Sequence, residues 1–157
     1  RRDYDALLPA LRASGVTLGV QNHCDRFVAN ALGLQRLLAS YDSRYVAAVW
    51  DAAHEALSGG LAEYALDAIW PQLCLVNLKN AFWQRINGPE AEVAVWRQYW
   101  TDGRSGLAHW PTVVAELVRR GYHGPVCLTA EYTDDSLVDT LAARDLVWAR
   151  SLFATEG

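Results

Sequence analysis

The sequence predicts an α/β fold in which four strand–helix units follow one another and their strands pair in parallel. Two observations carry this prediction. Short apolar runs alternate with segments whose apolar residues recur at helical spacing, and a polar side chain stands at the end of each run. The predicted strands are residues 16–20, 45–50, 73–78 and 126–130. Strands that alternate with helices in this way form parallel sheets.

The helices are predicted from apolar residues that recur every three to four positions. They cover residues 4–13, 27–40, 53–57, 61–70, 110–120 and 136–153. In the second helix, Phe27 is expected to lie on one apolar face with Ala31, Leu34 and Leu38. Pro71 ends the interrupted pair of helices that follows the second strand.

A long insertion, residues 81–106, separates the third strand from its helix. Its halves, 81–86 and 93–100, flank Asn87-Gly88-Pro89, which predicts a hairpin-like excursion. The insertion is rich in tryptophan. Trp83, Trp96 and Trp100 either line a substrate cleft, since aromatic faces stack on sugar rings, or pack the insertion onto the sheet.

Composition limits the class of protein. The chain has 157 residues, of which 52% are hydrophobic, so one domain with a sizeable core is expected. The net charge of −4, without basic runs, argues against nucleic acid or an anionic membrane as partner. No signal peptide and no apolar stretch of about 18 residues is present. We expect Cys74 and Cys127 to be buried free thiols in a reducing, cytoplasmic setting, whereas Cys24 follows a strand end.

The chain contains no methionine and opens with Arg1-Arg2-Asp3 directly before a helical pattern. We therefore expect residues 1–157 to be a single, partial domain and a fragment of a longer chain.

Polar side chains end the predicted strands on one side of the sheet. Gln21, Asp51, Asn77 and Glu131 stand at or near the carboxyl ends of the four runs. Because ligands meet side chains at the carboxyl ends of parallel strands, we expect these four to share one rim. Glu131 is not needed as a helix cap, since Asp134-Asp135-Ser136 is better placed for that role.

Side chains alternate along a strand, so parity assigns each one to a face. Gln21 shares its face with Gly19, and Glu131 shares its face with Cys127 and Thr129. The opposite faces of these two strands are apolar and suit a layer of covering helices. The small and polar faces suit the interior of a barrel.

Five short motifs occur in an order that matches a known family. They are Gly-Val-Thr-Leu-Gly-Val-Gln-Asn-His ending at His23, Asp51-Ala-Ala-His54, Leu-Val-Asn77-Leu-Lys79-Asn80, Gly106-Leu-Ala-His-Trp110, and Gly121-Tyr-His-Gly124 before Glu131. With these motifs the chain resembles the C-terminal half of a xylose-isomerase-like TIM barrel of the sugar phosphate isomerase/epimerase superfamily. The resemblance spans nearly the whole chain.

In that family two glutamates, an aspartate and a histidine hold a divalent cation at the rim, and the glutamates move protons. The resemblance implies that Asp51 and Glu131 are metal ligands and that Glu131 is also the catalytic acid/base. Gln21 and Asn77 take the positions of the first glutamate and of the histidine, and complete the predicted metal set.

The resemblance also implies residues that meet the substrate. His54, one helical turn after Asp51, matches a residue that touches substrate oxygens and assists catalysis; alternatively, it is a surface or capping histidine. Arg85 is loosely matched to a substrate-contacting arginine. From its place at the rim, Lys79 is expected either to bind an anionic group of the substrate or to be a solvated lysine, and Trp83 is a candidate stacking residue.

Two positions depart from the family pattern. Gln21 removes one carboxylate, and Asn77 replaces the imidazole that favours zinc, so an oxygen-rich set remains that suits Mg²⁺ or Mn²⁺ and binds it weakly or not at all. Gln cannot exchange a proton at ordinary pH, which leaves Glu131 as a single base that can shuttle a proton between adjacent carbons. Alternatively, Asp51 only caps the following helix, and Gln21 and Asn77 are polar plugs.

Four parallel strands in sequence place all their helices on one face. The other face is apolar and needs a cover, so the chain requires another half-barrel from upstream in the same chain, a second polypeptide or a second copy.

The predicted function is a divalent-metal sugar or sugar phosphate isomerase/epimerase with an eroded metal site, acting on a small-molecule sugar. A lyase or dehydratase on the same scaffold is hard to separate from it. The alternative is a non-catalytic relative that binds a sugar or a partner protein. A related metal-dependent endonuclease is disfavoured by the presence of only 4 histidines and no basic groove.

Overall fold

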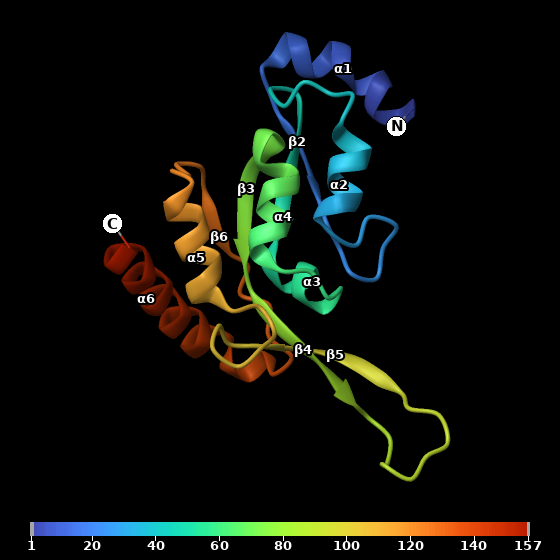
Figure 1. The fold of residues 1–157 in the computed structure, drawn as a ribbon, viewed down its shortest axis with the longest axis vertical. Helices are drawn as coiled ribbons and strands as arrows, with labels where there is room; N and C mark the ends of the chain where they lie inside the picture. Colours follow the sequence, from blue (N-terminus) through green and yellow to red (C-terminus); the bar gives the residue numbers. More distant parts are fainter. Residues whose placement is uncertain (1, 157) are drawn as a thin grey trace.

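The computed structural model describes residues 2–156, without the side chain of Glu156, and contains the predicted parallel sheet (Figure 1). The sheet has the order β1-β2-β3-β6, and each neighbouring pair is parallel. Its strands are β1 (Leu18–Gln21), β2 (Val46–Asp51), β3 (Leu73–Leu78) and β6 (Val126–Leu128). The four predicted strands and their consecutive order are confirmed.

The helices alternate with the strands along the chain, as predicted (Figure 1). They are α1 (Arg2–Ser14), α2 (Ala31–Leu38), α3 (Ala52–Leu57), α4 (Ala62–Ile69), α5 (Trp110–Arg119) and α6 (Val138–Glu156), with short 3₁₀ turns η1 (Trp70–Gln72) and η2 (Asp135–Leu137). Within residues 2–156, no helix combines the length and the apolar character that crossing a bilayer requires.

The hydrophobic core lies between the helices and one face of the sheet. Trp50 and Val76 from the strands pack there with Leu66 of α4 and Val114 of α5, and all four are at most 1% exposed. The other face, which we call the inner face, carries the alternate residues. On it Gly19 and Cys127 are exposed and Leu75 is half-buried. Gly19 and Cys127 lie on the predicted inner face, but β6 ends at Leu128, so the alternation does not extend to Glu131. The inner face has no cover within the described chain.

Two sequence-based expectations about burial are wrong. Phe27 is fully exposed and lies outside a helix. The helix begins only at Ala31, because the side chain of Asn30 accepts a hydrogen bond from the Gly33 N–H and caps it. Cys127 is exposed because its side chain points to the uncovered inner face, and Cys74 is half-buried.

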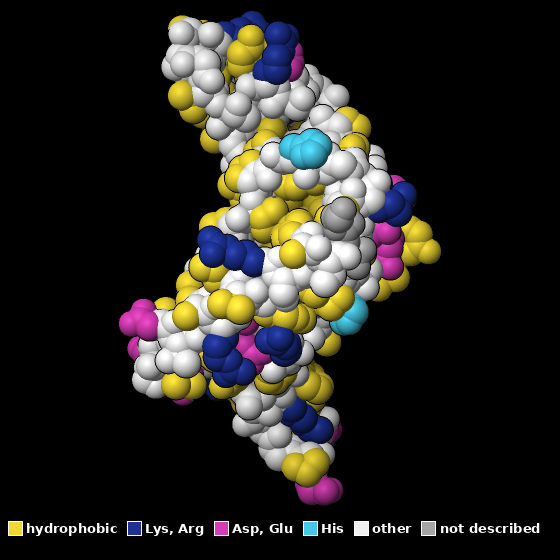
Figure 2. Space-filling model, turned by 90° about the vertical axis from the view of Figure 1, so that its left-hand side faces the viewer, with side chains coloured by type: hydrophobic (Ala, Val, Ile, Leu, Met, Phe, Trp, Pro, Cys, Tyr) yellow, Lys and Arg dark blue, Asp and Glu magenta, His cyan; other side chains and the backbone are white. Residues whose placement is uncertain are grey.

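The insertion forms the predicted hairpin. β4 (Asn80–Arg85) and β5 (Trp96–Thr101) pair antiparallel, and the hairpin projects from the body of the molecule as an arm (Figure 1). The arm also forms the tapering lower end in Figure 2. On the face shown there, Lys and Arg side chains are scattered among acidic and apolar ones without a continuous basic surface.

The two faces of the sheet predict different mutational costs. Leu66→Ala should lower the free energy of unfolding of this chain by about 2–5 kcal/mol, because it empties a fully buried site. Leu75→Ala, the same deletion on the inner face, should cost clearly less. Chemical denaturation of both variants measures the difference. Equal costs would mean that another surface already covers the inner face.

Candidate functional site

Asp51 is the buried centre of the rim. Its side chain is 0% exposed. Oδ1 accepts the His54 N–H at 3.0 Å and caps α3, whereas Oδ2 accepts from Gln21 Nε2 at 2.9 Å and lies 3.5 Å from Lys79 Nζ. Burial raises the pKa of the Asp51 carboxyl, and the Lys79 ammonium opposes that rise. Oδ1 of Asp51 therefore caps α3, and Oδ2 contacts the polar side chains of the rim.

Lys79 joins two carboxylates of the rim. Its side chain is 6% exposed, and its Nζ lies 2.6 Å from Glu131 Oε2 as well as 3.5 Å from Asp51 Oδ2. The ammonium also sits 4.3 Å from the centre of the Trp100 ring, a cation–π contact from the base of the arm. Asp51 and Glu131 thus share an ammonium between them.

Glu131 reaches the rim from a loop. β6 ends at Leu128, two residues before the predicted end, and Ala130 has a φ of +50°, in the left-handed region. The chain therefore turns before Glu131 instead of extending the strand. The Glu131 side chain remains 46% exposed, which makes it the accessible carboxylate of the pair.

The remaining predicted metal residues lie beside this pair. Gln21 donates to Asp51 across the β1–β2 edge, as a polar plug would. Asn77 is 6% exposed and stands in register with Asp51 on one side and Cys127 on the other. The structure therefore brings Gln21, Asp51, Asn77 and Glu131 to one rim.

Two asparagines that sequence reasoning did not single out hold the rim's backbone. Asn22 Oδ1 accepts the Asp51 N–H at 2.8 Å, and its Nδ2 donates to the Asp51 carbonyl at 3.2 Å. Asn80 Nδ2 donates to the carbonyls of Gly103 and Ala108 and so ties the loop before α5 to the sheet. Each follows a strand end and lies in one of the family motifs, and these are the signals that the sequence offers.

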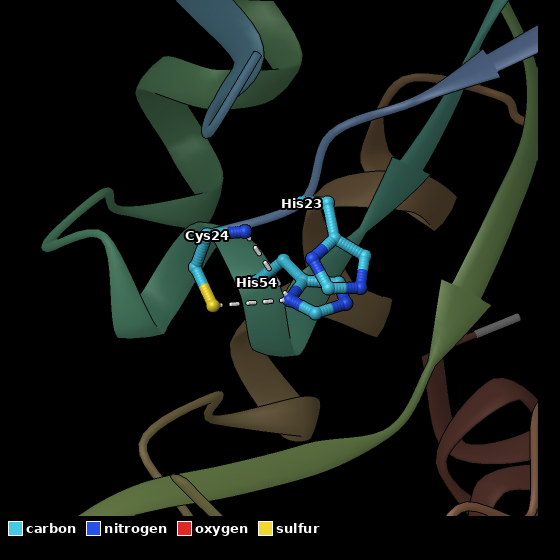
Figure 3. A group of neighbouring side chains, drawn as sticks. All are labelled: His23, Cys24 and His54. Carbon is cyan, nitrogen blue, oxygen red and sulfur yellow. Dashed lines mark hydrogen bonds between the residues drawn. The ribbon is translucent and has the colours of Figure 1, made fainter. Parts of the chain in front are cut away.

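His54 lies at the rim but is enclosed. Its side chain is 0% exposed, and its ring lies against that of His23 with the centroids 3.7 Å apart and the planes tilted by 34° (Figure 3). The ring also meets Trp100 edge-on at 5.2 Å. Burial lowers the pKa of His54 to about 3, and the Lys79 charge adds to this effect. Substrate contact by His54 stays a prediction, and it requires His23 to move aside.

Cys24 completes a cluster that the sequence analysis did not predict. Its Sγ lies 3.3 Å from His54 Nδ1, and its backbone N–H points to the same nitrogen at 3.4 Å (Figure 3). Gln98 Nε2 on β5 donates to this sulfur at 3.1 Å. The adjacent His23-Cys24 pair was the available signal, but its distance of thirty residues from His54 concealed the contact.

The predicted arm residues lie away from the carboxylates. Arg85 donates to the Asn87 side chain and to the Ala91 carbonyl, and so holds the tip of the arm together. Trp83 donates its indole N–H to the Leu57 carbonyl at 3.0 Å and is 39% exposed. Trp100, in contrast, contacts the Lys79 ammonium at the rim.

A family model described as "Xylose isomerase-like TIM barrel" matches residues 1–152. The chain belongs to this family. The resemblance stated from the motifs is therefore confirmed, and the four-stranded sheet corresponds to half of the family's barrel.

Solved structures of this fold are similar at low identity. The probable 3-DHS dehydratase of Bacillus anthracis has a TM-score of 0.70 and 16% identity, over 94% of this chain and 54% of its own. D-psicose 3-epimerase of Clostridium cellulolyticum with D-tagatose gives 0.65 and 14%, over 94% and 53%. A Mycobacterium smegmatis xylose isomerase-like protein in complex with magnesium gives 0.65 and 13%, over 93% and 47%.

The chain thus spans about half the length of the solved structures it matches. Comparison with curated proteins finds no match. At these identities the similarity establishes the fold, and the activity must be argued from the rim itself.

The enclosed imidazole predicts a pH dependence of stability. The pKa of His54 falls from 6.5 to about 3 on folding. Between these two pH values the imidazole is protonated in the unfolded chain and neutral in the folded chain. Stability should therefore fall as the pH drops below 6.5, by about 2 kcal/mol between pH 7 and pH 5. Denaturation of His54→Gln should lack this component. The exposed His123→Gln is the control, and an identical pH slope in both variants would contradict the burial argument.

Proposed function

We propose that residues 1–157 are a partial barrel domain of a sugar isomerase or epimerase in which an ammonium group occupies the centre of an eroded metal site. The observation that carries this proposal is the position of Lys79 Nζ, within ion-pair distance of both Asp51 and Glu131. A sugar or sugar phosphate is the proposed substrate, supported by the family and by the epimerase among the similar structures.

The divalent cation that the family implies does not fit the rim residues as they are arranged. Asp51 Oδ2 already faces the Gln21 amide N–H and the Lys79 ammonium, and Glu131 Oε2 is taken by the same ammonium. A divalent cation needs these oxygen lone pairs, and it would have to displace a positive charge to reach them. We therefore propose that Mg²⁺ or Mn²⁺ binds here weakly or not at all.

Lys79 and Glu131 can play different roles in a proton transfer. The Lys79 ammonium can donate to a carbonyl or hydroxyl oxygen of the substrate and stabilise negative charge that develops there. The half-exposed Glu131 carboxylate can take a proton from the carbon beside the carbonyl and return it to the neighbouring carbon. Gln21 cannot act as a second base, so aldose–ketose isomerisation is favoured over two-base epimerisation.

A non-catalytic role is the second candidate. The amides Gln21 and Asn77, which stand where the family has a glutamate and a histidine, favour a relative that binds a sugar or a partner without turnover. A dehydratase is a further variant of the catalytic reading, supported by the probable dehydratase among the similar structures.

The proposed function requires a second half-barrel. The inner face bears exposed Gly19 and half-buried Leu75, and a parallel sheet is stable when both of its faces are covered. We propose that a second half-barrel, from the same polypeptide or from another copy, completes the rim. The three unpaired cysteines support a reducing, cytoplasmic setting.

Solvent exchange tests the proposed chemistry. In deuterium oxide, the complete native assembly should exchange the hydrogen beside the carbonyl of a ketose or aldose, and it should do so in the presence of a chelator. Glu131→Gln should lower the exchange rate by about 100-fold or more, because the base is lost. Lys79→Arg should keep part of the rate and Lys79→Met little of it. Undiminished exchange in Glu131→Gln would refute the proposed base, and no exchange with any sugar would favour the binding role.

Metal titration tests whether the Lys79 ammonium excludes a divalent cation from the rim. The unsubstituted chain should bind Mn²⁺ poorly, and Lys79→Met should raise its affinity by about tenfold or more, because two carboxylates are freed. Lys79→Arg keeps the charge and is the matched control. Calorimetry measures the three affinities. Micromolar binding by the unsubstituted chain that Glu131→Gln abolishes would show that a metal displaces Lys79, and it would overturn this part of the proposal.

A further inference from the structure

We propose that His23, Cys24 and His54 form a binding site for a zinc ion, separate from the carboxylates of the rim. The sulfur and imidazole ligand atoms of these residues lie within 4.8 Å of one another (Figure 3). Two imidazoles and one thiolate are the donors that zinc prefers, and three protein ligands leave a fourth position open.

The distance between Cys24 Sγ and His54 Nδ1 suits a shared ion. The two atoms are 3.3 Å apart. Zinc bonds of roughly 2.3 Å to sulfur and 2.0–2.1 Å to nitrogen, at a tetrahedral angle, place the two ligand atoms about 3.6 Å apart. A small movement of the thiol therefore makes room for the ion, and burial keeps the His54 ring in place meanwhile.

His23 brings the third ligand from a loop that can adjust. It is half-buried, and its ring lies over that of His54. Its Nδ1 is paired with the Asp25 carboxylate, which leaves Nε2 for an ion. Carboxylates that hold the second nitrogen of an imidazole in this way commonly orient metal-binding histidines.

A neighbouring side chain can supply the fourth ligand. Gln98, whose amide reaches Cys24 Sγ at 3.1 Å, can present its carbonyl oxygen to the open position if the amide turns over.

The donor atoms separate this site from the rim. Sulfur and imidazole select zinc and similar ions over Mg²⁺ and Mn²⁺, whereas the carboxylates of Asp51 and Glu131 hold Lys79. Bound zinc would connect the loop after β1 to α3, and Gln98 would extend the connection to β5. It would thereby fix the base of the arm against the half-barrel.

Cobalt(II), a spectroscopic substitute for zinc, tests the proposal on the whole chain. Titration should produce one thiolate-to-cobalt charge-transfer band per chain, which zinc abolishes by displacement. Cys24→Ser should remove the band and weaken zinc binding by about 100-fold or more, since the thiolate is lost. His23→Gln should weaken binding while the fold, followed by circular dichroism, is retained.

Matched variants separate this site from other thiols and from the rim. Cys74→Ser and Cys127→Ser should leave the band unchanged, and Glu131→Gln should leave the zinc affinity unchanged. The proposal is overturned if no band forms, if Cys24→Ser binds zinc as the unsubstituted chain does, or if Cys74→Ser or Cys127→Ser removes the band. None of these outcomes depends on sugar chemistry, so they leave the proposed function untouched.

Discussion

The ion triad of Asp51, Lys79 and Glu131 is the interaction on which the rim depends. Asp51 is fully buried, and a buried carboxylate without a positive partner costs several kcal/mol. Lys79 supplies that partner from the end of β3 and also draws in Glu131 from the loop after β6. One ammonium thus binds the ends of three strand–loop units together, which is the task that a divalent cation performs in the family to which the chain belongs.

The burial of Asp51 explains why an amide at position 21 fits this rim better than a carboxylate. A carboxylate there would place a second negative charge beside buried Asp51, whereas Gln21 donates a hydrogen bond to it. Gln21 and Lys79 are therefore complementary to the same Asp51 oxygen. The amide of Gln21 and the ammonium of Lys79 thus balance the buried charge of Asp51 together.

The arm and the loop after β1 together close the region beside the triad. Trp100 at the base of the arm contacts both the Lys79 ammonium and the His54 ring, and Gln98 reaches Cys24. The insertion that looked like an excursion in the sequence therefore supplies part of the rim's wall at its base, while its tip, held by Arg85, extends away from the sheet.

The sequence by itself determined the four parallel strands, their order, the inserted hairpin and the face to which Gln21 and Cys127 belong, because apolar periodicity and strand parity are local properties. It also indicated that Gln21, Asp51 and Asn77 lie near neighbouring strand ends, whereas Glu131 reaches the same rim from the loop after β6. Only the tertiary structure decided that Lys79 lies between two carboxylates, that Phe27 is outside the second helix, and that His23 and Cys24 meet His54 across thirty residues. Those contacts depend on where long side chains turn and how loops fold back, and no spacing along the chain encodes that geometry.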